Sequence, residues 1–328
     1  MPVIFSIIFG IIPMLIYAWI IYWLDRYEKE PLVLIGGVFV WGAVFAAGMS
    51  YLINTLFGAG VYLFTGSESV TNITTGSLIA PIVEESLKGI AVLFVFLVFR
   101  QEFDSYLDGV VYAAITALGF AATENALYIY EKGYLLNGYS GIAWLVIVRI
   151  FLVGWQHPFY TAFTGLGLAV ARLNHTTWVK ILAPITGWSV AIFNHSFHNT
   201  LASLLPGFGG LMVGGVIDWT GWIFMFGFIV WCIYLEKQYI TRQLKEEVAL
   251  GVINSNQYQI ACSAWTQTLA KFNALSLGRY TITKQFYHNC AELAHKKHQR
   301  EDLGEESGNS KIIDRLRSEL RQYSPMVK

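Results

Sequence analysis

Two adjacent glutamates and a lysine, in the segment Glu84-Glu85-Ser86-Leu87-Lys88, lie inside an otherwise apolar run from 78 to 99. Ionisable side chains at membrane depth are costly, and they usually face a protein interior or an aqueous cavity where they have a function. Helical spacing brings Lys88 beside both glutamates, so its ammonium group balances part of their charge. A purely structural cluster is the alternative, and it is disfavoured because two carboxylates cost more than packing requires.

Carboxylate, imidazole and amide side chains from three further apolar segments fall at the same predicted depth as the glutamate pair. In the sixth segment they share one helix face, because they are three and four residues apart. These side chains are Glu124 and Asn125 in the fourth segment, His157 at the start of the fifth, and His195, His198 and Asn199 in the sixth.

Such a set of side chains is typical of water activation. A carboxylate acts as general base, a histidine donates or orients a proton, and an amide stabilises an oxyanion. The same groups would equally suit a zinc site with an open position for water. Taken singly, each also has a structural explanation, as an interhelical hydrogen bond or a helix cap. Their agreement in depth favours one shared site.

Composition predicts the elements that must position these residues. The chain has 328 residues, of which 55% are hydrophobic and 13% charged. Apolar segments of about 20 residues can cross a bilayer as helices. Seven segments qualify by this criterion, and we expect the first to be a retained helix rather than a signal peptide: 3–24, 32–57, 78–99, 107–131, 156–172, 178–204 and 210–235.

Two prolines refine these boundaries. Proline is best tolerated in the first turn of a helix. Pro158 therefore predicts a short interfacial helix near 142–153, a break at Gly154, and a new span beginning at His157. If Pro81 likewise starts the third span, the glutamate pair lies in its first turn.

The charge distribution predicts the domain organisation and the orientation. Residues 1–235 carry eight Lys or Arg and twelve Asp or Glu, and residues 236–328 carry fourteen and ten. We therefore expect an all-α polytopic membrane protein, with a transmembrane core over 1–235 and a soluble helical tail over 236–328. Basic residues concentrate in alternate loops, which places the N-terminus outside and the tail in the cytoplasm. No basic block indicates nucleic-acid binding, and the three cysteines lack metal spacing.

Four motifs, in this order and on separate segments, resemble those of PrsW-type intramembrane proteases, within the superfamily that includes the CAAX prenyl proteases. The resemblance covers roughly residues 20–202 and extends to Asp25–Pro31 and to Asp108-Gly109-Val-Val-Tyr112. The four motifs are Glu84-Glu85-x-x-Lys88, Phe120-x-x-x-Glu124-Asn125, His157 with Gly165-x-Gly167, and His195-x-x-x-Asn199.

This resemblance implies a peptidase that cuts a membrane-anchored protein near the surface of a prokaryotic plasma membrane. The best-known role of the family is the first, extracytoplasmic cut of an anti-sigma factor. Glu84 would be the leading general base, with Glu85 as partner or alternative and Lys88 balancing their charge. Because PrsW-type enzymes are often described as metalloproteases and CAAX-type enzymes resemble metal-free glutamate hydrolases, the resemblance leaves the metal open.

The resemblance also implies roles for the remaining site residues. Glu124, His157 and His195 would bind or activate water, and Asn199 with His195 would stabilise the oxyanion. A zinc ion, where used, would be held by Glu84, Glu124, His157 and His195, with Asn125 and His198 supporting. His198 departs from the family pattern, where an aromatic or apolar residue is common, and the tail extends beyond the family core.

Three other functions use the same residues. CAAX-type processing of lipidated C-termini is disfavoured because Glu124-Asn125 stands where those enzymes carry a histidine. A proton or cation transporter would use the same buried charges, but the sequence shows no pseudo-symmetric halves. A binding or immunity-type protein is least favoured, because every motif position is intact. The sequence indicates no particular oligomeric state.

Overall fold

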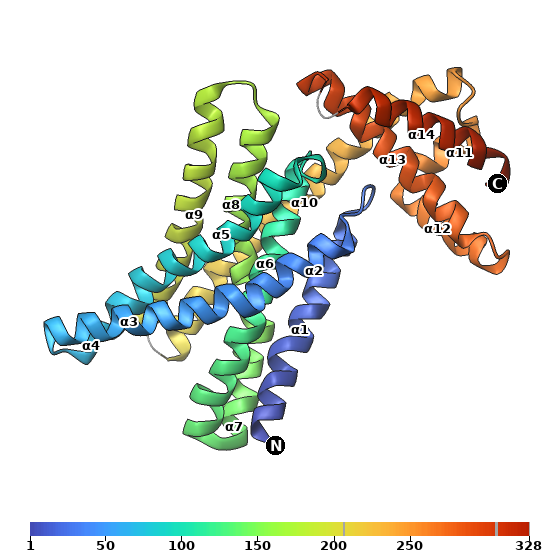
Figure 1. Ribbon diagram of the computed structural model, residues 1–328. Coiled ribbons are helices and arrows are strands. Elements are labelled where there is room, and N and C mark those ends of the chain that lie inside the picture. Colours follow the sequence, from blue (N-terminus) through green and yellow to red (C-terminus); the bar gives the residue numbers. More distant parts are fainter. Residues whose placement is uncertain (206, 306–307, 328) are drawn as a thin grey trace. The chain divides into compact units, whose positions relative to one another are not determined.

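The computed structural model describes residues 1–205, 207–305 and 308–327, and within these ranges the chain is helical without strands (Figure 1). This confirms the all-α prediction. The chain forms two compact units, Met1–Leu24 with Glu30–Gly227, and Asp25–Lys29 with Phe228–Lys328. Their boundary falls inside helix α10 (Phe208–Ala249). The division between core and tail expected at 235/236 therefore lies within one uninterrupted helix.

The helices of the first unit are linked by short turns or by π-helical turns, in which the hydrogen-bond ladder widens by one residue. The π-helical turns are Trp41–Ala46, Thr75–Ile79, Ile129–Tyr134 and Ile147–Leu152. The α-helices are α1 (Pro2–Leu24), α2 (Leu32–Val40), α3 (Ala47–Thr65), α4 (Glu68–Thr74), α5 (Ala80–Val98), α6 (Tyr106–Tyr128), α7 (Leu135–Val146), α8 (Gln156–Leu173), α9 (Thr177–Leu204) and the start of α10.

Apolar helices mark the chain as an integral membrane protein. Among the described residues, four helical runs are long and apolar enough to cross a bilayer: Pro2–Leu24, Leu32–Thr65, Tyr106–Leu173 and Gly209–Ala249. The third run contains several helices. Helices α5 and α9 carry the charged and polar residues of the candidate site, so composition alone does not mark them as spans. The arrangement with seven spans remains a prediction.

Helix α6 is the central helix of the first unit. Every side chain from Leu107 to Ala122 is buried, and α6 packs against α1, α8, α2 and the π-helical turn Trp41–Ala46. Glycines allow this close packing, since a Cβ at Gly165 would lie 1.9 Å from the carbonyl oxygen of Gly109, and one at Gly119 would lie 2.0 Å from that of Phe39. Small residues at such crossings let helix backbones approach closely.

A helical hairpin follows α6 and returns the chain alongside it. The reversal is at Gly138, whose φ of 61° and ψ of −146° lie outside the helical region. Gly133 and Gly141 pack against each other across the hairpin. The helix predicted over 142–153 is present in α7 and the π-helical turn Ile147–Leu152, and the predicted break follows before α8 begins at Gln156. The returning arm brings Arg149 beside the end of α6.

The helix that carries the glutamate pair begins much earlier than Pro81. Ser67 caps α4 by accepting a hydrogen bond from the backbone N–H of Val70, and helical backbone then continues through the π-helical turn Thr75–Ile79 into α5. The prediction that the pair lies in a first turn was therefore wrong. Proline lacks the N–H that the regular ladder needs, and the chain absorbs this in the preceding π-helical turn rather than by ending the helix.

The second unit is a helical cluster with its own apolar core. That core contains Phe286, Tyr287, Cys290 and Leu293, all fully buried. Its helices are the end of α10, α11 (Ser255–Ala261), α12 (Ala264–Ser276), α13 (Tyr280–Leu303) and α14 (Asn309–Tyr323).

Candidate functional site

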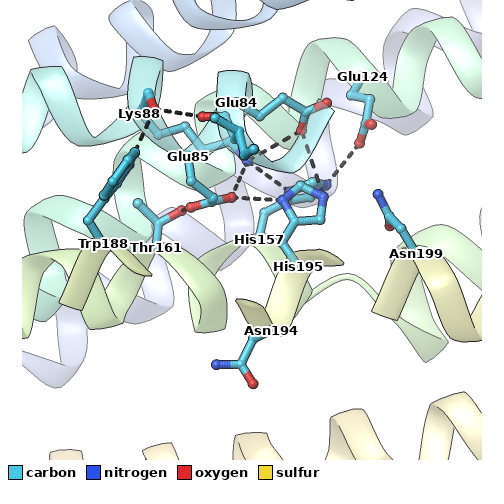
Figure 2. Close-up of polar contacts among 12 residues, drawn as sticks. Glu84, Glu85, Lys88, Glu124, His157, Thr161, Trp188, Asn194, His195 and Asn199 are labelled. Carbon is cyan, nitrogen blue, oxygen red and sulfur yellow. Dashed lines mark hydrogen bonds and ion pairs between the residues drawn. The ribbon is translucent and has the colours of Figure 1, made fainter. Parts of the chain in front are cut away.

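Side chains from α5, α6, α8 and α9 meet in one hydrogen-bonded cluster (Figure 2). At its centre is Lys88, which is fully buried. Its Nζ donates to Oε1 of Glu85 at 2.8 Å and lies 3.7 Å from Oε2 of Glu84. Nζ also lies 4.0 Å from the centre of the Phe120 ring, a cation–π contact. The predicted pairing of Lys88 with both glutamates is thus present.

Glu85 has both carboxylate oxygens occupied. Oε1 is bonded to Lys88 and lies 3.0 Å from Nδ1 of His195, and Oε2 accepts from Oγ1 of Thr161 at 2.8 Å. The Glu85 side chain has no exposure to solvent. A buried carboxylate is stable only when paired and hydrogen-bonded in this way. Glu85 therefore fixes the orientation of its neighbours, and neither of its oxygens is without a hydrogen-bond partner.

His157 is held between Lys88 and Glu124. Its Nδ1 lies 3.1 Å from Nζ of Lys88, and its Nε2 lies 2.9 Å from Oε2 of Glu124. An ammonium group only donates, so Nδ1 accepts and Nε2–H donates to Glu124. Arg149 completes the chain, with Nη2 donating to Oε2 of Glu124 at 2.6 Å and Nε to Oδ1 of Asn125 at 2.8 Å.

Glu84 differs from Glu85 in having an unsatisfied oxygen. Its Oε1 accepts only a long bond, 3.5 Å, from Nδ2 of Asn54. Its Oε2 is buried and has no hydrogen-bond partner among the described residues. Nε2 of His195 lies 3.8 Å from this oxygen, and its lone pair is free because Nδ1–H donates to Glu85. Two acceptors thus face each other across a gap that a proton, a water molecule or a cation would bridge.

Three side chains around this gap could hold a metal ion, provided that Lys88 releases Nδ1 of His157. Glu84, His157 and His195 each offer one ligand atom, and these atoms lie within 4.8 Å of one another. One carboxylate and two imidazoles form a donor set that catalytic zinc sites use. Glu124 is not in this trio. It binds Nε2 of His157, as Glu85 binds Nδ1 of His195, and such carboxylate–histidine contacts orient metal ligands from outside the first coordination sphere.

The cluster also carries fewer positive than negative charges. Within the described part of the chain, three carboxylates (Glu84, Glu85 and Glu124) face two cations (Lys88 and Arg149). Burying a net charge is expensive. One further positive charge near Glu84, from a proton or a metal ion, would remove the deficit.

Two predicted residues, Asn199 and His198, lie outside the cluster, and a third, Asn125, lies at its edge. Nδ2 of Asn199 donates to the backbone oxygen of Gly76 at 2.8 Å, and Figure 2 shows its side chain apart from the bonded groups. Asn125 binds Arg149 instead of a reacting group. His198 faces away from the glutamate pair, toward Gln156 and Asp218.

Sequence reasoning missed Arg149, Thr161 and Asp218 as partners of the site. Arg149 and Asp218 are lone ionisable residues in apolar segments, which is the same signal that singled out Glu84 and Glu85. Thr161 gave no signal, because a threonine in a helix commonly bonds its own backbone.

Comparison with known proteins agrees with the motifs. The model of the PrsW family intramembrane metalloproteases matches residues 30–233. The chain is 29% identical to Protease PrsW of Geobacillus kaustophilus over 165 residues, 49% of this chain and 66% of the relative. It is 35% identical to Protease PrsW of Clostridioides difficile over 138 residues, 42% of this chain and 56% of the relative. For Protease PrsW of Bacillus subtilis the identity is 33% over 189 residues, 55% of this chain and 83% of the relative.

The chain thus spans less than two thirds of the length of the first two relatives. No solved structure gives a significant match. The family model covers more than half of the chain and includes all the residues of the cluster, and on this basis the chain belongs to the PrsW family of intramembrane metalloproteases.

Proposed function

We propose that the chain is an intramembrane endopeptidase that hydrolyses a peptide bond in a single-pass membrane protein. Family membership supports this, and the observation that carries it is the buried Oε2 of Glu84, which accepts no hydrogen bond and lies beside a free imidazole nitrogen. Hydrolysis needs a group that takes a proton from water at the point of attack. Glu84 is the member of the glutamate pair with an oxygen available for this task.

The other residues of the cluster keep this base in position. Glu85 holds Nδ1 of His195, so that its Nε2 faces Glu84. Glu124 holds Nε2 of His157, so that its Nδ1 faces Lys88. Lys88 limits the build-up of negative charge, and its bond to Glu85 leaves Glu84 as the basic partner. Preorganised groups of this kind lower the barrier because they need not reorient during the reaction.

We further propose zinc as the metal, held by Glu84, His157 and His195. When bound there, zinc would act as a Lewis acid that activates the attacking water, and Glu84 would then be a ligand instead of the free general base. Glu124 and Glu85 would then orient the two histidine ligands.

The location of the cut follows from the proposed orientation. With the N-terminus outside and the second unit in the cytoplasm of a prokaryotic cell, the cluster lies in the outer half of the membrane. The substrate would be cut on its extracytoplasmic side, and a single-pass anti-sigma factor is the first candidate.

The test uses the full chain expressed with an epitope-tagged single-pass anti-sigma factor. New protein N-termini in the membrane fraction are identified by mass spectrometry for wild type, Glu84→Gln and a control, Glu68→Gln. Glu68 is an exposed carboxylate at the start of the same helical run. We expect cleavage by wild type and the control only. Cleavage by a folded Glu84→Gln protein would refute the assignment of the base.

The metal is tested separately, by elemental analysis of detergent-purified protein. About one zinc per chain, lost in His157→Ala and His195→Ala, is the expected result for a three-ligand site. A preparation that cleaves the substrate without zinc would refute the metal assignment and leave Glu84 as the base.

A further inference from the structure

A second polar site lies beside the catalytic cluster, between α8, α9 and α10. It is a pocket of about 190 Å³ whose wall includes Phe159, Phe197, Leu201 and Ile217. Pockets that hold whole small molecules usually exceed about 300 Å³. This pocket therefore has room for one side chain rather than for a cofactor.

The polar end of the pocket is a built constellation of buried groups. Oδ2 of Asp218 accepts from Nε2 of Gln156 at 2.6 Å and lies 3.0 Å from Nδ1 of His198. Asp218 is 5% exposed and Gln156 7%. Among the described residues that line the pocket, none is a lysine or arginine. Asp218 therefore gives this end of the pocket acceptor character.

Tyr160 connects the pocket with the catalytic cluster. Its ring stacks on His195 with centroids 5.1 Å apart, and the centroid of the His198 ring lies 6.3 Å from that of Tyr160. Tyr160 is 2% exposed and lines the pocket, yet its hydroxyl has no hydrogen-bond partner among the described residues. A buried hydroxyl left unbonded is destabilising. Because the hydroxyl itself is closed off from solvent, Tyr160 joins the pocket to His195 through its ring.

We propose that this pocket is a subsite for one substrate side chain near the scissile bond, and that it selects a side chain that donates hydrogen bonds, such as asparagine or lysine. The inference rests on the proposed proteolytic function. Asp218, with its charge, accepts from the incoming donor, and the ring of Tyr160 forms part of the wall. The apolar wall accommodates the aliphatic part of the side chain.

Two adjacent glycines of α10 provide a matched pair of variants. A Cβ added at Gly214 or at Gly215 would meet no atom within 4 Å, but only Gly214 lines the pocket. Gly214→Leu should therefore add bulk at the pocket with no clash at its Cβ, and Gly215→Leu places the same bulk elsewhere. Asp218→Asn removes the charge with little change of shape.

The experiment uses the anti-sigma factor of the preceding test, with each residue that flanks its cleavage site replaced in turn by alanine, leucine, asparagine or lysine. Cleavage rates are measured for wild type and the three variants, and thermal unfolding in detergent checks that each is folded. At one substrate position, wild type should prefer asparagine or lysine over leucine. Loss of a hydrogen bond to a charged group should reduce this preference about tenfold in Asp218→Asn.

The remaining variants separate a subsite from a general effect. Gly214→Leu should lose cleavage of the asparagine and lysine substrates while it retains that of the alanine substrate, and Gly215→Leu should behave as wild type. The subsite proposal would be refuted if Gly214→Leu and Gly215→Leu had equal effects, or if every variant showed the substrate preference of wild type. The proposed proteolytic function would stand in either case. If Asp218→Asn does not fold, the comparison of Gly214→Leu with Gly215→Leu still tests whether the pocket is a subsite. If wild type cleaves no substrate, the proposed function fails and the subsite with it.

Discussion

Replacing Gly165 by alanine should damage the site from a distance, because it forces α6 and α8 apart. The added Cβ would lie 1.9 Å from the carbonyl oxygen of Gly109 and 2.9 Å from Cβ of Ala113, whereas real Cβ atoms essentially never come closer than 3.0 Å. The obstacle is backbone, which cannot rotate away as a side chain can. The two helices must therefore separate by roughly 1 Å at this crossing, since overpacked cores relax by shifting backbone.

That separation acts on a bond between the same two helices. Helix α8 carries His157 and α6 carries Glu124, and Nε2 and Oε2 are now 2.9 Å apart. An added distance of roughly 1 Å takes the pair beyond hydrogen-bond range. We expect a loss of about 1–3 kcal/mol in the free energy of unfolding, as for other overpacked cores. Cleavage should fall about 100-fold, as a misplacement of 1 Å can cause.

The assay compares thermal unfolding in detergent and cleavage per folded molecule for wild type, Gly165→Ala and Gly48→Ala. A Cβ at Gly48 would meet nothing within 4 Å. Because alanine is the better helix former, the control should be as stable as wild type or more so. Wild-type stability and cleavage in Gly165→Ala would refute the argument that this crossing sets the geometry of the site.

Two further predictions concern a residue of the site and the second unit. Arg149→Met should reduce cleavage at least about tenfold, because it leaves the partly buried carboxylate of Glu124 without its guanidinium partner; an unchanged rate in a folded variant would exclude Arg149 from the site. Burial raises the pKa of the Cys290 thiol, so this thiol should resist maleimide in the folded chain while the partly exposed Cys262 reacts. Labelling of Cys290 at the rate of Cys262, followed by peptide mass spectrometry, would contradict the packing of this core.

The charged residues of the site could be predicted because their signal is energetic. A glutamate or histidine in an apolar segment must find partners, and the residues singled out on this basis, Glu84, Glu85, Lys88, His157 and His195, do meet in the structure. Their shared depth in the membrane was sufficient to predict that α5, α8 and α9 meet. The position of Lys88, three and four residues after the glutamates, predicted its contacts with both.

The partners of these residues could not be predicted, because they depend on where the backbone turns. Arg149 reaches Glu124 only because the hairpin reverses at Gly138. The spacing of residues in the sequence does not predict the positive φ of that glycine. Asn199 is similar. Its place on the face of His195 predicted a role in the site, but its amide donates instead to the backbone oxygen of Gly76 in the π-helical turn before α5. Residue type predicts that a bond will form, and the tertiary path of the chain decides with which group.

The π-helical turn Thr75–Ile79 contains one residue more than a regular helical turn would hold. The wider turn takes up this residue, so the segments on either side continue in the same directions. Loss of a single residue there would restore a regular helix and leave both Glu68–Thr74 and the glutamate pair facing as they do now. This turn is therefore a point where related chains could differ in length by one residue while the catalytic geometry stays constant.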